Sequence, residues 1–369
     1  MPAVRPRHPA AAALALLLLG AVSACGYGSE ARKDPAAQVT AEGPKTDGLD
    51  TVKIGFFGNV THATPLIGLQ QGLFQKELGG TAVKSSVFNA GPAEIEALNS
   101  GAIDIGWIGP SPAINGYAKS HGKSLKIIGG SASGGVSLVV NPKKVRSLDD
   151  LKGKKIATPQ LGNTQDVALL NYLAEKGYRV DATTGKGDVT VQRTENKVTP
   201  TAFQQGAIDA AWVPEPTAAK LVSVGGKTLL DEKDLWKDGK FVITNMIVSQ
   251  KFLAEHPKAV EAVLRASVRT NAWIRSHPAQ AVKALNEKLA DPQISGKALP
   301  ADIIGPAFKN TDVTDDPLAA TLQLEADHAV KAGLLQKPDL KGIYDLRLLN
   351  KVLKAEGKKP VDAAGLGDD

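Results

Sequence analysis

Alternating strand-like and helix-like stretches fill residues 51–249. Short runs rich in β-branched and aromatic residues predict strands at 51–57, 83–88, 102–108, 125–129 and 136–140. Apolar residues at helical spacing predict helices at 65–78 and 93–99. The pattern restarts at Leu148, with strands at 154–158, 189–193, 207–213 and 241–249 and helices at 164–176 and 201–205. Strands that alternate with helices favour a parallel α/β sheet.

From residue 250 onward the pattern is mostly helical. Helices are predicted at 250–255, 258–276, 279–289, 317–332 and 344–356. Asp-Pro and His-Pro dipeptides lie between several of them, because a residue before proline disfavours the α conformation. This helical tail must pack onto one of the sheet regions that precede it.

An internal repeat links the two α/β regions. Residues 97–107 read ALNSGAIDIGW and residues 202–212 read AFQQGAIDAAW. Within residues 101–107 five identities recur at one offset of 105 positions, and both copies stand between a helix and a strand. We interpret them as equivalent elements of two similar α/β lobes, with a recurring helix–strand turn as the alternative.

Composition agrees with a soluble globular protein of about two domains. The 369 residues carry 44 Lys+Arg and 38 Asp+Glu, and 43% are hydrophobic. The net charge of +6 is small, and no basic run alternates with aromatic residues, so we expect no nucleic-acid partner. Cys25 is the only cysteine, which excludes an intrachain disulfide.

The N-terminus has the order of a signal peptide. Arg5 and Arg7 precede an Ala/Leu-rich run at 10–22. This run is too short to span a bilayer, which requires a helix of about 20 residues. A short anchor helix is the alternative. Residues 22–25 (VSAC) resemble a bacterial lipobox, which implies cleavage after residue 24 and a lipid on Cys25. Residues 25–50 then form a flexible tether, because they contain few large apolar groups.

Several strings together resemble one protein family. They are GLQQGLF at 68–74, LNSGAIDIG at 98–106, LDDLKGKK at 148–155, GNTQD at 162–166, Glu215-Pro216 and SQKFLAEHP at 249–257. The chain resembles, over roughly residues 52–290, the substrate-binding proteins of ABC importers for nitrate, taurine and aliphatic sulfonates. The set of strings is specific, whereas each string alone is weak.

The resemblance implies an α/β, bilobal fold of the second periplasmic-binding class, with a hinge of two crossing strands. Lobe 1 would comprise residues 51–139 and 244–369, and lobe 2 residues 140–243. It implies an extracytoplasmic lipoprotein, anchored to the outer face of the cell membrane. This monomer would capture a small organic anion, with an aliphatic sulfonate or taurine favoured, and deliver it to a permease and its ATPase in sulfur metabolism.

Four loops that follow predicted strands are candidate ligand-binding segments, at 58–62, 109–113, 131–135 and 162–166. Each combines glycine with Ser, Thr or Asn, and backbone N–H groups at helix starts can hold an oxyanion. Simple helix capping is the alternative. The predicted ligand contacts are Asn59, Thr61, His62, Ser111, Gly134, Gly135, Asn163, Thr164, Gln165, Asp166, Trp212 and Glu215.

Some of these residues have two interpretations. Trp212 either contacts the alkyl part of the ligand or fills the core. Glu215 either neutralises a ligand ammonium group or braces the hinge, and His62 either donates to the anion or is structural. We expect Asp166 to face away from the anionic head.

Enzyme motifs are missing from the sequence. We find no His-Glu-x-x-His, Cys-x-x-Cys or Gly-x-Ser-x-Gly pattern, and no glycine pair continues into a P-loop. We therefore predict no catalytic residues, no cofactor and no metal site. The alternative function is a non-transport member of the same fold, which would be a sensor domain or a scavenging enzyme such as a pyrimidine synthase.

Overall fold

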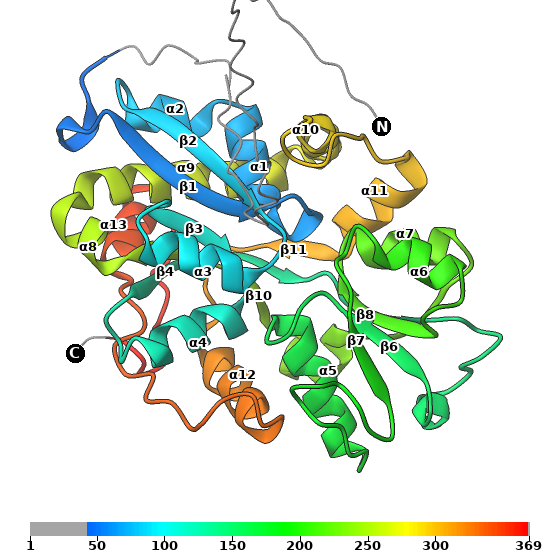
Figure 1. Cartoon of the computed structure of the whole chain (residues 1–369). Coiled ribbons are helices and arrows are strands. Elements are labelled where there is room, and N and C mark those ends of the chain that lie inside the picture. Colours follow the sequence, from blue (N-terminus) through cyan, green and yellow to red (C-terminus); the bar gives the residue numbers. More distant parts are fainter. Residues whose placement is uncertain (1–42, 368–369) are drawn as a thin grey trace, which may run out of the picture. The chain divides into compact units, whose positions relative to one another are not determined.

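The computed structural model describes residues 43–367, which form two β-sheets with helices packed around them (Figure 1). We call each sheet with its helices a lobe. The predicted signal peptide, Cys25 and most of the predicted tether lie outside the described residues. Within them, no helix combines the length and the apolar character that a membrane span requires.

The larger lobe contains a six-stranded sheet in the order β11-β4-β10-β3-β1-β2. Its strands are β1 (Thr51–Phe57), β2 (Ala82–Phe88), β3 (Ile105–Ile108), β4 (Leu125–Gly134), β10 (Val242–Ser249) and β11 (Thr311–Val313). β1 is parallel to β2 and β3, whereas β10 runs antiparallel to both β3 and β4. The sequence predicted a parallel sheet, but the observed sheet is mixed, because β10 returns to it from the other lobe.

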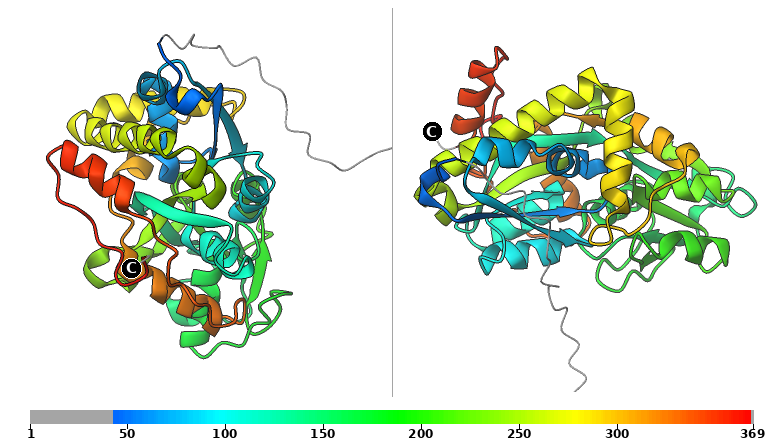
Figure 2. Two further views of the ribbon diagram at one scale, coloured as in Figure 1. Left: turned by 90° about the vertical axis from the view of Figure 1, so that its left-hand side faces the viewer. Right: turned by 90° about the horizontal axis from the view of Figure 1, so that it is seen from above.

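Helices cover both faces of this sheet (Figure 2). On one face, α2 (Leu73–Leu78) places Phe74 edge-on to Trp107 of β3. On the other face, Glu94 of α3 (Gly91–Asn99) lies over Gly55 and Gly106. The larger lobe also contains α1 (Ala63–Gln70), α4 (Pro110–Lys119), α8 (Gln250–Glu255), α9 (Pro257–Ser276), α10 (Pro278–Ala290), α11 (Ala301–Lys309), α12 (Ala319–Lys331) and α13 (Arg347–Ala355).

The smaller lobe contains a five-stranded sheet in the order β7-β6-β8-β5-β9. Its strands are β5 (Val136–Val140), β6 (Lys155–Thr158), β7 (Thr190–Arg193), β8 (Ala210–Pro214) and β9 (Lys227–Asp231). Its helices are α5 (Thr164–Glu175), α6 (Thr199–Gln204) and α7 (Thr217–Ser223). The chain leaves the larger sheet at Gly134 and returns with β10, so two connections join the sheets.

The internal repeat occupies equivalent places in the two sheets. Gly101 and Gly206 both have left-handed backbones, with φ of 72° and 71°. Asp104 accepts the backbone N–H of Lys53 at 2.8 Å, and Asp209 accepts that of Lys155 at 2.9 Å. Each aspartate thereby ties the start of its strand to the neighbouring strand, so the sequence identity reflects the same turn in both lobes.

Several elements differ from the sequence prediction. The helix predicted at 65–78 is broken at Gly72, whose φ is 66°, into α1 and α2. The loop predicted at 109–113 already contains the first residues of α4, and that predicted at 131–135 belongs mostly to β4. The elements α4, α7, β9, α11 and β11 are not among the predicted ranges, and each is at most ten residues long.

Ordered structure begins before Thr51, where the sequence predicted a flexible tether. The backbone N–H of Thr46 donates to the hydroxyl oxygen of Thr81 at 2.8 Å. The Asp47 carboxylate accepts the backbone N–H groups of Lys258 and Ala259 at 2.9 and 3.1 Å. Because these amides belong to the first turn of α9, the carboxylate satisfies groups that a helix N-terminus leaves free.

Candidate functional site

The residues predicted to contact a ligand gather where the two lobes meet, and nearly all are buried. Thr61, His62, Ser111, Thr164 and Gln165 are each at most 4% exposed, whereas Asn59 is half-buried. They come from both lobes, and Thr164 of the smaller lobe lies against Gly109 of the larger one.

One close contact between the lobes joins the N-termini of α4 and α5. Gly109 caps α4, and a Cβ at this position would lie only 2.4 Å from the Thr164 hydroxyl oxygen. The Ser111 and Thr164 side-chain oxygens are buried, and neither has a hydrogen-bond partner among the described residues. In the first turn of α4 only Ser111 carries a backbone N–H, because Pro110 and Pro112 have none. In α5 the Asp166 N–H donates to the Asn163 carbonyl at 3.0 Å, so the amides of Thr164 and Gln165 are the ones without an intrahelical acceptor. The hydroxyl and backbone N–H groups at this junction can therefore donate to an anion, and the positive ends of the two helix dipoles favour negative charge there.

Asn163 and Gln165 extend this junction toward α3. The amide group of Asn163 donates to the Gln165 side-chain oxygen at 3.1 Å. Its own oxygen lies 3.5 Å from the backbone nitrogen of Gly91, at the start of α3. Because Gly91 belongs to the larger lobe, Asn163 makes a direct contact across the lobe boundary.

The first loop forms a closed hydrogen-bond network. The His62 ring nitrogens lie 2.9 Å from the Trp107 carbonyl oxygen and 2.7 Å from the Asn59 side-chain oxygen. The Thr61 hydroxyl donates to the same Asn59 oxygen at 2.9 Å. Burial lowers the pKa of His62 to about 3, so this imidazole is neutral near pH 7. A neutral imidazole has a single N–H to donate. With this N–H on Nε2 it pairs with the Trp107 carbonyl, so His62 has a structural role in this closed arrangement.

Gly134 and Gly135 lie on the first connection between the sheets, and Glu215, which follows β8, is hydrogen-bonded to it. Gly134 and Gly135 have φ of 73° and 70°, the left-handed region that glycine adopts most readily. The Glu215 backbone N–H donates to the Gly135 carbonyl at 2.8 Å, and its carbonyl accepts the N–H of Val60 at 3.2 Å. Its carboxylate accepts the Ala219 N–H at 3.0 Å and the Asn310 amide at 3.3 Å. Burial raises the Glu215 pKa, and these contacts brace the hinge.

Asp166 and Trp212 are engaged inside the smaller lobe. Asp166 accepts the Thr158 hydroxyl at 2.7 Å, the Gly162 N–H at 3.0 Å and two guanidinium bonds from Arg193 at 2.9 and 3.2 Å. The Trp212 indole N–H donates to a carboxylate oxygen of Glu232 at 2.6 Å, and its ring is fully buried. Neither group has capacity left for a ligand in this conformation.

Sequence reasoning missed a polar residue on β10. Asn245 is fully buried, and neither its amide nitrogen nor its oxygen has a hydrogen-bond partner among the described residues. It lies opposite Ile108, the last residue of β3, two positions before α4 begins. The available signal was an asparagine inside the mostly apolar run at 241–249.

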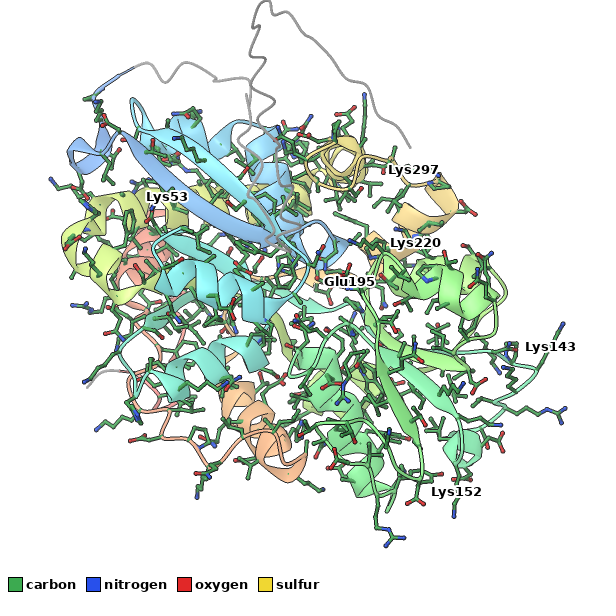
Figure 3. All side chains as sticks on the ribbon, in the orientation of Figure 1. Lys53, Lys143, Lys152, Glu195, Lys220 and Lys297 are labelled. Carbon is green, nitrogen blue, oxygen red and sulfur yellow. The ribbon has the colours of Figure 1, made fainter. Side chains whose placement is uncertain are left out.

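Two surface hollows lie away from this junction. One, of about 320 Å³, is bordered by Lys126, Gln250, Leu253, Ala254, Pro257, Asp345, Arg347 and Leu348. The other, of about 480 Å³, is bordered by Lys143, Lys144, Arg146, Asp149, Asp150, Lys152 and Lys154. Figure 3 shows Lys143 and Lys152 at the outer end of the smaller lobe. Within residues 43–367, no group of three or more His, Cys, Asp or Glu residues could hold a metal ion.

Comparisons with known proteins assign the chain to a family. The model of the NMT1-like family matches residues 45–287. A binding protein of Brucella abortus (strain 2308) is 28% identical over 234 residues, which cover 63% of this chain and 69% of that protein. An Escherichia coli (strain K12) protein named for binding aliphatic sulfonates is 28% identical over 225 residues, covering 60% and 66%.

Among solved structures, the alkanesulfonate-binding protein of Xanthomonas axonopodis pv. citri, bound to MOPS, superposes with a TM-score of 0.64. The two sequences are 24% identical, and the superposition covers 80% of this chain and 96% of the Xanthomonas chain. The match confirms the bilobal periplasmic-binding-protein fold that the sequence predicted. The sequence relatives are binding proteins, as the resemblance implied.

Proposed function

Since the chain belongs to the NMT1-like family, we propose that it is the extracytoplasmic solute-binding component of an ABC importer. It captures a small organic anion, with an aliphatic sulfonate or taurine favoured, between its two lobes. It then delivers the anion to a membrane permease driven by its ATPase. In this proposal the protein is a monomer that binds without turnover, and a lipid on Cys25 anchors it to the outer face of the cell membrane.

One observation carries the ligand assignment. Ser111 and Thr164 stand in the first turns of two helices from different lobes, and their buried hydroxyls lack partners within residues 43–367. A buried donor without an acceptor costs about 1–3 kcal/mol, so such groups are rare unless something else binds them. An anion between the two helix N-termini would accept from both hydroxyls and from the adjacent backbone N–H groups.

A sulfonate suits this junction because it presents three acceptor oxygens and one negative charge. Helix N-termini each carry roughly half a positive charge, so two of them can offset one anion without a cationic side chain. Asn163 and Gln165 would adjust as the lobes separate, since Asn163 contacts Gly91 across the boundary. We assign supporting roles to Asn59, Thr61, His62, Gly134, Gly135 and Glu215, and we leave Asp166 and Trp212 out of the site.

A thermal-shift screen tests the proposal. The purified protein is heated with small sulfonates, taurine, nitrate, bicarbonate and a pyrimidine precursor, each over a range of concentrations. A ligand at 100 times its Kd stabilises the folded state by about 2.7 kcal/mol, which raises the melting temperature measurably. Stabilisation by a sulfonate, with the compound recovered unchanged, supports the proposal. Stabilisation by the pyrimidine precursor alone, or its conversion, contradicts it.

A further inference from the structure

The amide of Asn245 is an unusual feature of the lobe boundary. Asn245 lies on β10, opposite Ile108 on one side and Gly130 on the other. Its side chain is fully buried, and both polar atoms lack partners among the described residues. Leaving a buried amide unpaired costs about 1–3 kcal/mol for each group, so a ligand that pairs with Asn245 would stabilise the closed arrangement.

Another buried asparagine shows how this chain satisfies such a side chain when its role is structural. Asn271 on α9 is also fully buried. Its oxygen accepts the Thr64 hydroxyl at 2.7 Å, and its nitrogen donates to the Thr314 carbonyl at 3.2 Å and to Asp315 at 2.8 Å. Every polar atom of Asn271 is therefore paired inside the protein, whereas those of Asn245 are not.

The strand that carries Asn245, β10, runs beside the proposed anion site. Ile108, the partner of Asn245 across the strands, is followed at once by Gly109 and by α4. A Cβ at Gly109 would lie 2.4 Å from the Thr164 hydroxyl oxygen and 3.7 Å from the carbonyl oxygen of Ile243, which is also on β10. The unpaired groups of Ser111, Thr164 and Asn245 thus come from two helices and one strand that meet at Gly109.

The chemistry of these three groups differs. The hydroxyls of Ser111 and Thr164 donate to an anion, and so does the Asn245 amide nitrogen. The Asn245 oxygen can only accept, and the anionic head of a sulfonate offers it no proton. We infer that Asn245 is a specificity-determining residue, and that the ligand is a small anion whose organic part carries a hydrogen-bond donor. This inference rests on the proposed function and narrows its substrate class.

Two probe anions of nearly equal size test the inference. In 2-hydroxyethanesulfonate, a hydroxyl replaces the terminal methyl group of propane-1-sulfonate. We expect calorimetry on the full chain to show at least about tenfold tighter binding of the hydroxy compound, because a site that hydrogen-bonds a hydroxyl rejects an analogue without it. Asn245→Leu, which keeps the approximate volume but removes both polar atoms, should bind the two probes within about twofold of each other.

Two further variants guard against a folding effect. Asn245→Ala supplies a second test of the preference if the leucine variant does not fold, as judged by circular dichroism. Asn271→Ala is the matched control, and it should lower the melting temperature while keeping the preference. Equal binding of the probes by the parent protein, or an unchanged preference in both Asn245 variants, overturns the inference alone. Failure of every anion to bind overturns the proposed function as well.

Discussion

Replacing Thr164 by valine separates two consequences of its buried hydroxyl. Thr164 is 2% exposed, and its oxygen has no partner among the described residues. Valine has nearly the same shape, so it removes an unpaired polar group from the closed, ligand-free protein. Because such a group costs about 1–3 kcal/mol, we expect the ligand-free melting temperature to be unchanged or raised.

Ligand binding should change in the opposite direction. A hydrogen bond to a charged group contributes about 1.5–3 kcal/mol, so the Thr164→Val variant should lose roughly 10- to 150-fold in affinity. Calorimetry with the best anion from the thermal-shift screen measures this loss. Thr164→Ser retains the hydroxyl and is the matched control, with affinity within a few-fold of the parent. Binding by the valine variant within twofold of the parent would refute the assignment of Thr164.

Three further predictions concern closure, pH and anchoring. Gly109→Ala should hold the lobes apart, because the new Cβ would lie 2.4 Å from the Thr164 hydroxyl oxygen. Alanine tolerates the φ of −67° at this position, so the backbone itself is not strained. Small-angle scattering should then show no ligand-induced compaction, and normal compaction would contradict this prediction. Burial raises the pKa of Glu232 from 4.5 to about 7, so the folded state retains a proton that the unfolded chain releases in this interval. Stability should fall by up to about 3 kcal/mol as the pH rises from 4.5 through 7, and denaturation of Glu232→Gln, whose side chain still accepts from Trp212, should show a flatter profile. Cys25→Ser should prevent lipidation, and mature protein that still partitions with membranes would contradict the lipoprotein assignment.

The order of the elements was readable from local patterns. β1, β2, α5, β10 and α9 lie within a residue or two of their predicted ranges. The repeat at 97–107 and 202–212 also predicted two lobes with one architecture. Gly101 and Gly206 end their helices in the left-handed conformation, and Asp104 and Asp209 begin their strands, so this feature is local.

The candidate site was readable only in part. Ser111 and Thr164 were predicted because short hydroxyl residues at helix starts after strands are typical of anion sites. Asp166 shares that loop, but Arg193, which is 27 positions away in the sequence, binds both of its carboxylate oxygens. No local pattern encodes that pairing, so the sequence alone could not tell a ligand contact from an internal ion pair.

The sequence by itself determined the alternating order of strands and helices, the repeated lobe and the hydroxyl-rich helix starts. Each of these features depends on residues that are close together in the sequence. Only the tertiary structure decided which groups at the lobe boundary remain unpaired. Trp212 is satisfied by Glu232, whereas Asn245 has no partner within residues 43–367. The physical reason is that satisfaction of a buried polar group depends on atoms that folding brings together from distant segments, here from two lobes and the strand that joins them.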